Sequence, residues 1–227
     1  MFGNNPIRKP VKGEGKQLEV QSIFKTLQGE GIYTGWPAIF IRLGGCNLAC
    51  DFCDTEFESF KTLDIDAIIA QTNQLSGKIP EDVKWTHKLI VLTGGEPFRQ
   101  PITLLCDRLI EEGYYIQIET NGTLYRPLDE RVDIICSPKV SNKSYHPIRE
   151  DLLKHINAFK FIVSTSHPDY QSIPDIGQDI FGTPVYVQPM DELDAVKNKD
   201  NMAYAVTLAQ ENGYRLSLQT HKILDIE

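Results

Sequence analysis

The sequence predicts an α/β fold in which a partial, open barrel of about six parallel strands is surrounded by outer helices. Three observations predict it. Short apolar runs alternate with helical patterns, glycine and polar residues follow one predicted strand after another, and the strands are fewer than the eight of a closed barrel. Ligands of α/β sheets bind at the carboxyl ends of the strands, so we expect a site at that edge.

The predicted strands are short runs rich in β-branched and aromatic residues. They cover residues 38–43, 88–92, 115–118, 132–136, 158–163, 184–187 and 214–218, and residues 20–27 are a candidate for a further short strand outside that count. Apolar residues at helical spacing predict helices over residues 63–75, 102–112 and 200–212. The last two helices end at Gly113 and Gly213. The connection from Thr120 to Val132 is too short for a helix, which interrupts the alternation there.

The bulk properties are those of a globular chain with one domain. Its 227 residues suffice for one sizeable core, which we expect over residues 18–227, and the polar residues 1–17 predict a flexible N-terminal tail. A net charge of −8 argues against a nucleic-acid surface. No apolar run approaches the ~18 residues of a membrane helix, and the N-terminus carries no signal pattern. We therefore expect a cytoplasmic protein that acts on a small molecule.

Three of the five cysteines lie in one loop with the spacing C-x3-C-x2-C: Cys46, Cys50 and Cys53. Cys106 and Cys136 lie in apolar segments, which predicts that they belong to the core. In a reducing cytoplasm, such a cluster indicates a metal site rather than disulfides. Three thiolates with one open position favour an iron–sulfur cluster. A closed structural metal site is the alternative, and it would need a fourth ligand.

A second motif, Thr93-Gly94-Gly95-Glu96-Pro97, follows a predicted strand. Glycines allow a ligand to approach the backbone, and a carboxylate could hold a cationic amino group. A plain strand-to-helix turn is the other interpretation.

Together, the cysteine spacing and the Gly-Gly-Glu-Pro motif resemble the radical S-adenosylmethionine (SAM) superfamily. The resemblance implies a partial TIM-like barrel of the radical SAM type. It also implies that the three cysteines hold a [4Fe–4S] cluster whose fourth iron is chelated by SAM, and that electron transfer from the cluster yields a 5′-deoxyadenosyl radical.

Further segments resemble the 7-carboxy-7-deazaguanine synthase family, from about Gln21 to the C-terminus. They are Phe24–Gly31, Arg42, Cys53-Asp54-Thr55, Ser137-Pro138-Lys139 and Gln219-Thr220-His221-Lys222. This resemblance implies a carbon–nitrogen lyase of queuosine (7-deazapurine) biosynthesis, the tRNA modification pathway. Its substrate would be 6-carboxy-5,6,7,8-tetrahydropterin, converted to 7-carboxy-7-deazaguanine with loss of ammonia and with SAM regenerated. It further implies Mg²⁺, a flavodoxin-type reductant and a homodimer.

The resemblance also implies roles for individual residues of this chain. The pterin substrate would contact Leu27, Gln28, Gly29, Glu30, Arg42, Thr93, His221 and the C-terminal Glu227. SAM would contact Gly94, Gly95, Glu96, Ser137, Pro138, Lys139, Gln188, Pro189, Met190 and Asp191. Thr55 would be the Mg²⁺ ligand. An arginine in an apolar strand needs an anionic partner, so Arg42 would pair with the substrate carboxylate or, alternatively, with Glu30.

Two other functions share part of this pattern. A radical SAM activase, which makes a glycyl radical on a partner protein, would need the cysteines but not Gln28, Arg42 or His221. An iron–sulfur electron-transfer protein would need a fourth ligand. The short spacing between Cys46 and Cys50, where some family members carry a long insertion, leaves open what shields that side of the loop and which reductant docks there.

Overall fold

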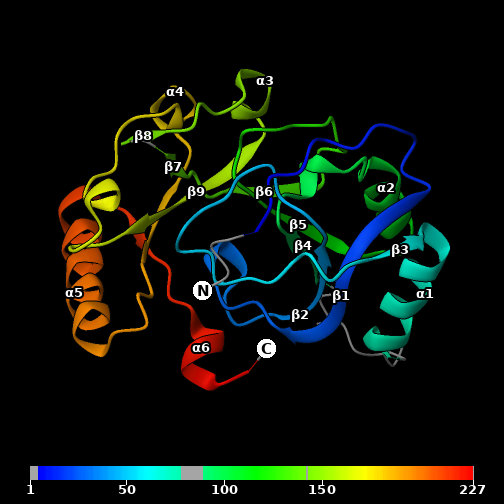
Figure 1. The fold of residues 1–227 in the computed structure, drawn as a ribbon, viewed down its shortest axis with the longest axis horizontal. Coiled ribbons are helices and arrows are strands. Elements are labelled where there is room, and N and C mark those ends of the chain that lie inside the picture. The colour runs from blue at the N-terminus through cyan, green and yellow to red at the C-terminus, as the bar shows by residue number, and fades with distance from the viewer. Residues whose placement is uncertain (1–4, 78–88, 142, 227) are drawn as a thin grey trace.

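A nine-stranded sheet organises the residues that the computed structural model describes, which are 5–77, 89–141 and 143–226. Its strands lie in the order β11-β10-β9-β6-β5-β4-β2-β1-β3 (Figure 1). The bounds are β1 Gln17–Leu27, β2 Pro37–Leu43, β3 Lys61–Asp64, β4 Leu89–Gly94, β5 Tyr115–Thr120, β6 Val132–Cys136, β9 Ile156–Val163, β10 Val185–Pro189 and β11 Arg215–Leu216. A separate pair joins β7 Val140–Ser141 to β8 Ser144–Tyr145.

Seven neighbouring strands of the sheet pair in parallel, namely β11, β10, β9, β6, β5, β4 and β2. This confirms the predicted parallel, open α/β sheet. The first predicted strand differs, because β1 runs antiparallel to β2. Only residues 28–36 connect the two strands, and a parallel crossover needs about a dozen residues or more. Leu27 therefore pairs with Pro37 at the start of β2, and the Gln28–Glu30 segment lies at the amino ends of the parallel strands.

Three longer helices, α1 Ile65–Ser76, α2 Thr103–Glu111 and α5 Ala195–Asn212, pack on the outer face of the sheet (Figure 1). The helix predicted from residue 63 begins at Ile65, because Lys61–Asp64 pairs with β1 instead. The helix predicted from residue 200 begins at Ala195, where the Asp194 carboxylate caps the first turn. Cys106 and Cys136 are fully buried in the core, as predicted.

Three short helices complete the chain: α3 Glu150–Leu153, α4 Gln178–Phe181 and α6 Thr220–Leu224. The last predicted strand shrinks to the two residues of β11, and α6 begins directly after it. None of the helices in the described parts of the chain has the length and apolar character needed to cross a membrane.

The inner face of the curved sheet is closed at its amino end and open at its carboxyl end. Tyr33 and Trp36, in and after the 3-10 turn Gly31–Tyr33, pack against Ala38, Leu89 and Val91. Ile32 of the same turn packs against a second small apolar cluster on β6, β9 and β10. The β1–β2 connection thus forms an apolar plug below the space that holds the site.

The described part of the N-terminal segment is held in place, where the sequence predicts a flexible tail. The backbone N–H of Arg8 donates to the carbonyl of Cys46 at 2.7 Å, and that of Val11 donates to the carbonyl of Arg99 at 2.7 Å. Residues 5–11 therefore lie along the cysteine loop, and the expected freedom does not apply to them.

Candidate functional site

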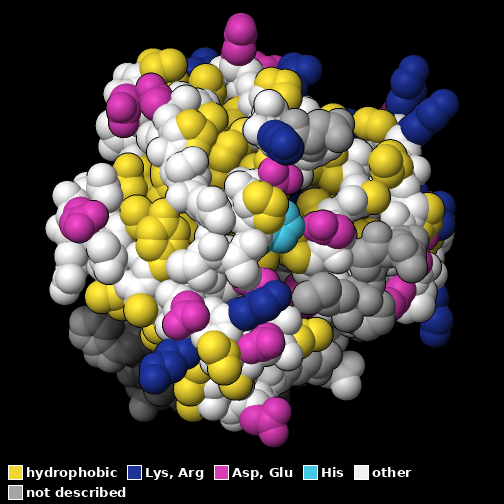
Figure 2. Space-filling view, turned by 60° about the vertical axis from the view of Figure 1, so that its left-hand side comes forward, with side chains coloured by type: hydrophobic (Ala, Val, Ile, Leu, Met, Phe, Trp, Pro, Cys, Tyr) yellow, Lys and Arg dark blue, Asp and Glu magenta, His cyan; other side chains and the backbone are white. Residues whose placement is uncertain are grey.

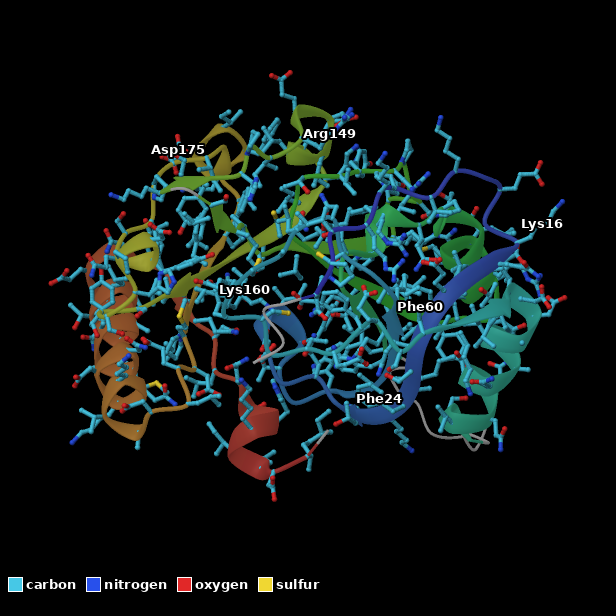
Figure 3. All side chains as sticks on the ribbon, viewed as in Figure 1. Lys16, Phe24, Phe60, Arg149, Lys160 and Asp175 are labelled. Carbon is cyan, nitrogen blue, oxygen red and sulfur yellow. The ribbon has the colours of Figure 1, made fainter. Side chains whose placement is uncertain are left out.

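A cavity of about 490 Å³ fills the space between the carboxyl-edge loops and the β1–β2 connection. Lys160, on β9, and Phe24, on β1, both line it, and both residues are labelled in Figure 3. Acidic and basic side chains are interspersed over the face of the molecule in Figure 2. We call the side of the cavity at the cysteine loop, where Cys50 and Cys53 are half-buried, the mouth, and the side where Gln28 and Lys160 are buried beside Glu30 the deep end.

The cysteine loop leaves β2 through Gly44-Gly45, and two glycine turns meet there. A Cβ at Gly95 would lie 2.2 Å from the carbonyl oxygen of Gly45, so the two backbones are in direct contact. Gly94 has a φ of +137°, which disfavours any other residue. The N–H of Glu96 donates to the Gly45 carbonyl at 3.1 Å. The Gly-Gly-Glu-Pro motif thus fixes the start of the cysteine loop.

Cys46, Cys50 and Cys53 all line the mouth of the cavity. Burial raises the pKa of the Cys46 thiol to about 12, and the neighbouring Glu96 carboxylate adds to this. Burial also raises the pKa of Cys50, while the Lys139 ammonium opposes the rise. Burial thus favours the neutral form of these two thiols, and a bound group that brings positive charge would favour the thiolate form.

The three sulfurs do not form a preassembled site for a single ion. Nowhere in residues 5–77, 89–141 and 143–226 do three or more His, Cys, Asp or Glu side chains gather as ligands of one metal ion. In a [4Fe–4S] cluster each cysteine thiolate binds a different iron, so three cysteines that line one cavity suit that cluster without having to meet at one point.

Most of the residues that the resemblance links to SAM line the same cavity: Gly94, Gly95, Ser137, Lys139, Gln188, Pro189, Met190 and Asp191. The Lys139 ammonium donates to the Ser137 hydroxyl at 2.7 Å and to the Ser137 carbonyl at 2.8 Å. Pro138 is not part of the lining.

Glu96 is not part of the lining either, and its contacts give it a different role. Its fully buried carboxylate accepts hydrogen bonds from the Phe98 N–H, the Thr120 hydroxyl and the Asn121 N–H at 3.0, 2.7 and 2.8 Å. Burial raises the pKa of Glu96 to about 7 against these donors. Glu96 joins the turn after β4 to the end of β5, and a direct contact with the SAM amino group is not what this geometry supports.

Two carboxylates and one ammonium form a buried cluster deep in the cavity. The Lys160 ammonium forms ion pairs with Glu30 and, at 2.8 Å, with Glu119. The Gln219 side-chain amide donates to the Glu30 carboxylate at 3.0 Å. Burial alone would raise the pKa of Glu30, but the charge and hydrogen bond of Lys160 outweigh it and lower that pKa to about 2. Burial raises the pKa of Glu119. Burial would lower the pKa of Lys160, but the charges of Glu119 and Glu30 outweigh it and raise that pKa.

Lys160 and Gln219 have no assigned role in the sequence analysis, although both line the cavity. The sequence marks Lys160 as unusual, because it is the single charged residue in the otherwise uncharged strand INAFKFIV. A buried lysine needs a partner, and its partners, Glu30 in the β1–β2 connection and Glu119 on β5, are far away in sequence. Pattern reading therefore identifies the lysine but not the carboxylates that it pairs with.

Gln28 carries an unused donor beside this cluster. Its side chain is 2% exposed, and its carbonyl oxygen accepts from the Glu30 N–H at 3.1 Å. Its amide nitrogen has no partner within the described protein. Leaving a buried donor unpaired costs about 1–3 kcal/mol, so this atom indicates an acceptor on a ligand. Leu27, Arg42 and Thr93 line the cavity as well, with the Arg42 guanidinium 5.7 Å from the centre of the Phe24 ring.

The start of α6 covers the cavity from the side. The Thr220 N–H and hydroxyl both donate to the Gly29 carbonyl at 3.1 Å. A Cβ at Gly29 would lie 2.2 Å from Nδ1 of His221, so only glycine lets His221 reach its place in the lining. Gly29 acts through this contact and does not itself line the cavity. Burial lowers the pKa of His221, which favours the neutral ring, although Glu30 opposes this.

Charged contacts tie α6 to both neighbouring loops. The Lys222 ammonium lies 2.9 Å from Asp54 and 2.9 Å from Asp191. Thr55, the expected Mg²⁺ ligand, lines the cavity next to Asp54, whose carboxylate accepts from its hydroxyl at 3.2 Å. Glu227 lies outside the described residues, and Ile226 before it lines the cavity.

The fold and the three-cysteine loop define the class of protein. Residues 40–162 match the family model of the radical SAM superfamily, whose members use a [4Fe–4S] cluster and SAM. The chain is 57% identical to the 7-carboxy-7-deazaguanine synthase of Rickettsia prowazekii over 100% of this chain and 96% of that one. It is 38% identical to the Rhodospirillum rubrum synthase, with full coverage of both chains. The chain therefore belongs to the 7-carboxy-7-deazaguanine synthase family.

A solved structure supports the fold independently. The chain superposes on the crystal structure of QueE from Escherichia coli with a TM-score of 0.71, covering 89% of this chain and 93% of that one at 24% identity. The open, mostly parallel sheet is thus the fold of that protein too.

Proposed function

We propose that this protein is a lyase that converts 6-carboxy-5,6,7,8-tetrahydropterin into 7-carboxy-7-deazaguanine with loss of ammonia. One observation carries the proposal beyond family membership: the buried, unpartnered amide nitrogen of Gln28 at the deep end of a cavity whose other end carries the three cysteines. A planar heterocycle with ring nitrogens and a carbonyl would supply the acceptor that this donor lacks.

Cys46, Cys50 and Cys53 would hold the [4Fe–4S] cluster. The backbone at Gly94-Gly95, with Ser137, Lys139 and the Gln188–Asp191 segment, would hold SAM. When bound, these two groups supply the one-electron reduction that generates a carbon-centred radical. The protein's part is to hold the reacting carbon near the mouth and to exclude water from it. Thr55 would bind Mg²⁺, which usually takes few protein ligands and completes its shell with water and substrate oxygens.

The deep end would recognise and orient the substrate. Leu27, Gln28 and Glu30 would contact the pyrimidine part of the pterin, and Arg42 would pair with its carboxylate. Thr93 and His221 would contact the ring, and the carboxylate of Glu227 would be a further contact. The pairing of Glu30 with Lys160 supports this arrangement, because it keeps Glu30 ionised as an acceptor for the N–H groups of the pterin.

The wider setting follows the same resemblance. The chain would act as a cytoplasmic homodimer, reduced by a flavodoxin-type protein, with one catalytic domain over residues 18–227. The burial of Gln28 favours a small molecule over a glycyl radical on a partner protein, because a peptide backbone could not reach a side chain that is 2% exposed.

A product assay tests the proposal. Anaerobically reconstituted protein is incubated with SAM, a reductant and the carboxy-tetrahydropterin, and the products are separated by chromatography and mass spectrometry. We expect 7-carboxy-7-deazaguanine and one equivalent of ammonia, with no 5′-deoxyadenosine accumulating in step with product. Stoichiometric deoxyadenosine would contradict the reuse of SAM, and turnover of SAM without deazaguanine would contradict the assigned substrate.

A further inference from the structure

Residues 5–11, here called the strap, run along one side of the cysteine loop. Ile7 pairs with Cys46 in a short parallel bridge, and the Arg8 N–H donates to the Cys46 carbonyl at 2.7 Å. The Arg8 guanidinium donates to both carboxylate oxygens of Glu58 and lies 5.1 Å from the centre of the Phe60 ring. The strap is therefore bonded to the loop at its first cysteine and again beyond its last.

The other end of the strap is anchored as firmly. The Val11 N–H donates to the Arg99 carbonyl at 2.7 Å, and the Arg126 guanidinium donates to the Val11 carbonyl at 2.5 Å. The Arg99 guanidinium donates to the Lys9 carbonyl at 3.3 Å. A Cβ at Gly45 would lie 2.7 Å from Cδ of Arg8, so the residue before Cys46 must be small for the strap to lie this close.

Asn5, at the near end of the strap, reaches a cysteine sulfur. Its side-chain amide nitrogen lies 3.9 Å from Sγ of Cys53, within reach of an N–H···S hydrogen bond, and donates to the Thr55 carbonyl at 3.2 Å. Asn5 also lines the cavity. The Thr55 bond fixes the amide, so the donor aimed at Cys53 is held by a second contact. Cys46 receives a comparable contact from the backbone N–H of Leu48 at 3.4 Å.

We propose that the strap covers the exposed side of the cluster loop and that Asn5 is a positioning residue that sets the reduction potential of the bound cluster through its hydrogen bond to Cys53. This inference rests on the proposed assignment of the three cysteines to the cluster. Only three residues separate Cys46 from Cys50, so that loop is too short to cover itself. Hydrogen bonds to cysteine sulfur are one of the levers that tune such potentials. A donor withdraws electron density from the thiolate and favours the reduced cluster.

The test is a potentiometric titration of the reconstituted holoenzyme, followed by the EPR signal of the reduced cluster. At a fixed solution potential, Asn5→Ala is expected to lower the ratio of reduced to oxidised cluster about threefold to tenfold, where tenfold corresponds to ~59 mV for one electron. Asn5→Asp is nearly isosteric, and it replaces the donor by a carboxylate, so it is expected to lower the ratio further. Asn212→Ala is the matched control, because Asn212 bonds the Leu208 carbonyl of its own helix.

Iron and sulfide contents separate the inference from the proposed function. If the wild-type chain takes up no [4Fe–4S] cluster, the assignment of the cysteines fails and this inference fails with it. If wild type and both Asn5 variants carry the cluster at equal content and equal potential, the role of Asn5 is overturned while the proposed function stands. If Asn5→Ala alone loses the cluster, the reduction potentials of wild type and Asn5→Asp are compared instead. A lower potential in Asn5→Asp supports the role of Asn5, and an equal potential overturns it.

Discussion

The mouth and the deep end of the cavity differ in how their ionisable side chains are stabilised. At the mouth, burial raises the pKa values of Cys46 and Cys50, so these thiols need a positively charged group to become thiolates. At the deep end, Lys160 already compensates Glu30 and Glu119 without a ligand. The mouth lies on the loop after β2, whereas the deep end combines two strands, β5 and β9, with the β1–β2 connection. Cofactor binding and fold stability therefore depend on different residues, and a substitution at one end should change one property without the other.

Loss of a cysteine should separate the two ends most clearly. Cys50→Ala is expected to abolish [4Fe–4S] uptake and product formation while leaving the unfolding free energy of the cluster-free protein within about 0.5 kcal/mol of wild type, as for most substitutions outside a core. Iron analysis and visible absorption measure the first effect, and urea unfolding measures the second. Cys106→Ala, in the core, is the contrasting control: it should keep the cluster and lose stability. Full iron content in Cys50→Ala would disprove the assignment of that ligand.

Removal of the buried ammonium should do the reverse. Lys160→Met leaves two carboxylates facing each other without a cation, and breaking a buried ion pair in this way costs about 3–5 kcal/mol. Urea unfolding of the cluster-free protein measures the loss, with exposed Lys199→Met as the matched control. Adding Glu119→Gln to Lys160→Met should recover part of the loss. An unfolding free energy equal to that of wild type would show that the deep end is not charge-compensated as described.

The contact between Gly29 and His221 allows a finer test of the deep end. In Gly29→Ala the new Cβ would meet Nδ1 of His221 at 2.2 Å, so the ring or the start of α6 must move. We expect a loss of about 1–3 kcal/mol in unfolding free energy, typical of an overpacked site, together with a raised KM. In the Gly29→Ala, His221→Ala double variant the clash with the ring is absent and only the 3.0 Å approach to the backbone nitrogen of residue 221 is left, so the two effects should not add. Simple additivity would argue against the contact.

Acid should weaken the deep end through Glu30. Its pKa is about 2 in the folded protein and about 4.5 when unperturbed, so the unfolded chain binds the proton more tightly. The stabilisation from ionised Glu30 is therefore complete above pH 4.5 and is lost as the pH falls toward 2. Between pH 5 and pH 3 it should fall by on the order of 1–2 kcal/mol. Glu30→Gln lacks this component, so its stability difference from wild type should shrink over that interval. A difference that is constant with pH would refute the lowered pKa.

The patterns that survive in the structure are local ones. The parallel strands, the helices around Ile68 and Leu105, and the buried Cys106 follow from apolar periodicity, which a chain shows before it folds. Errors arise where pairing between strands decides the structure: Leu63 and Asp64 are predicted as helix but belong to β3, which pairs with β1, and β1 itself runs antiparallel to β2. The site divides in the same way. The cysteine loop and glycine turn are contiguous motifs, whereas Lys160 meets Glu30 across 130 residues of sequence.

By itself, the sequence determined the class of chemistry, because the C-x3-C-x2-C spacing brings three soft ligands together on one short loop. It also determined the strands that carry that loop. Only the tertiary structure decided that Glu96 joins the turn after β4 to the end of β5, that Gly29 makes room for His221, and that residues 5–11 lie along the cysteine loop. The physical reason is the same in each case: hydrogen bonds and steric contacts between distant segments depend on distance in space, and spacing along the chain does not encode it.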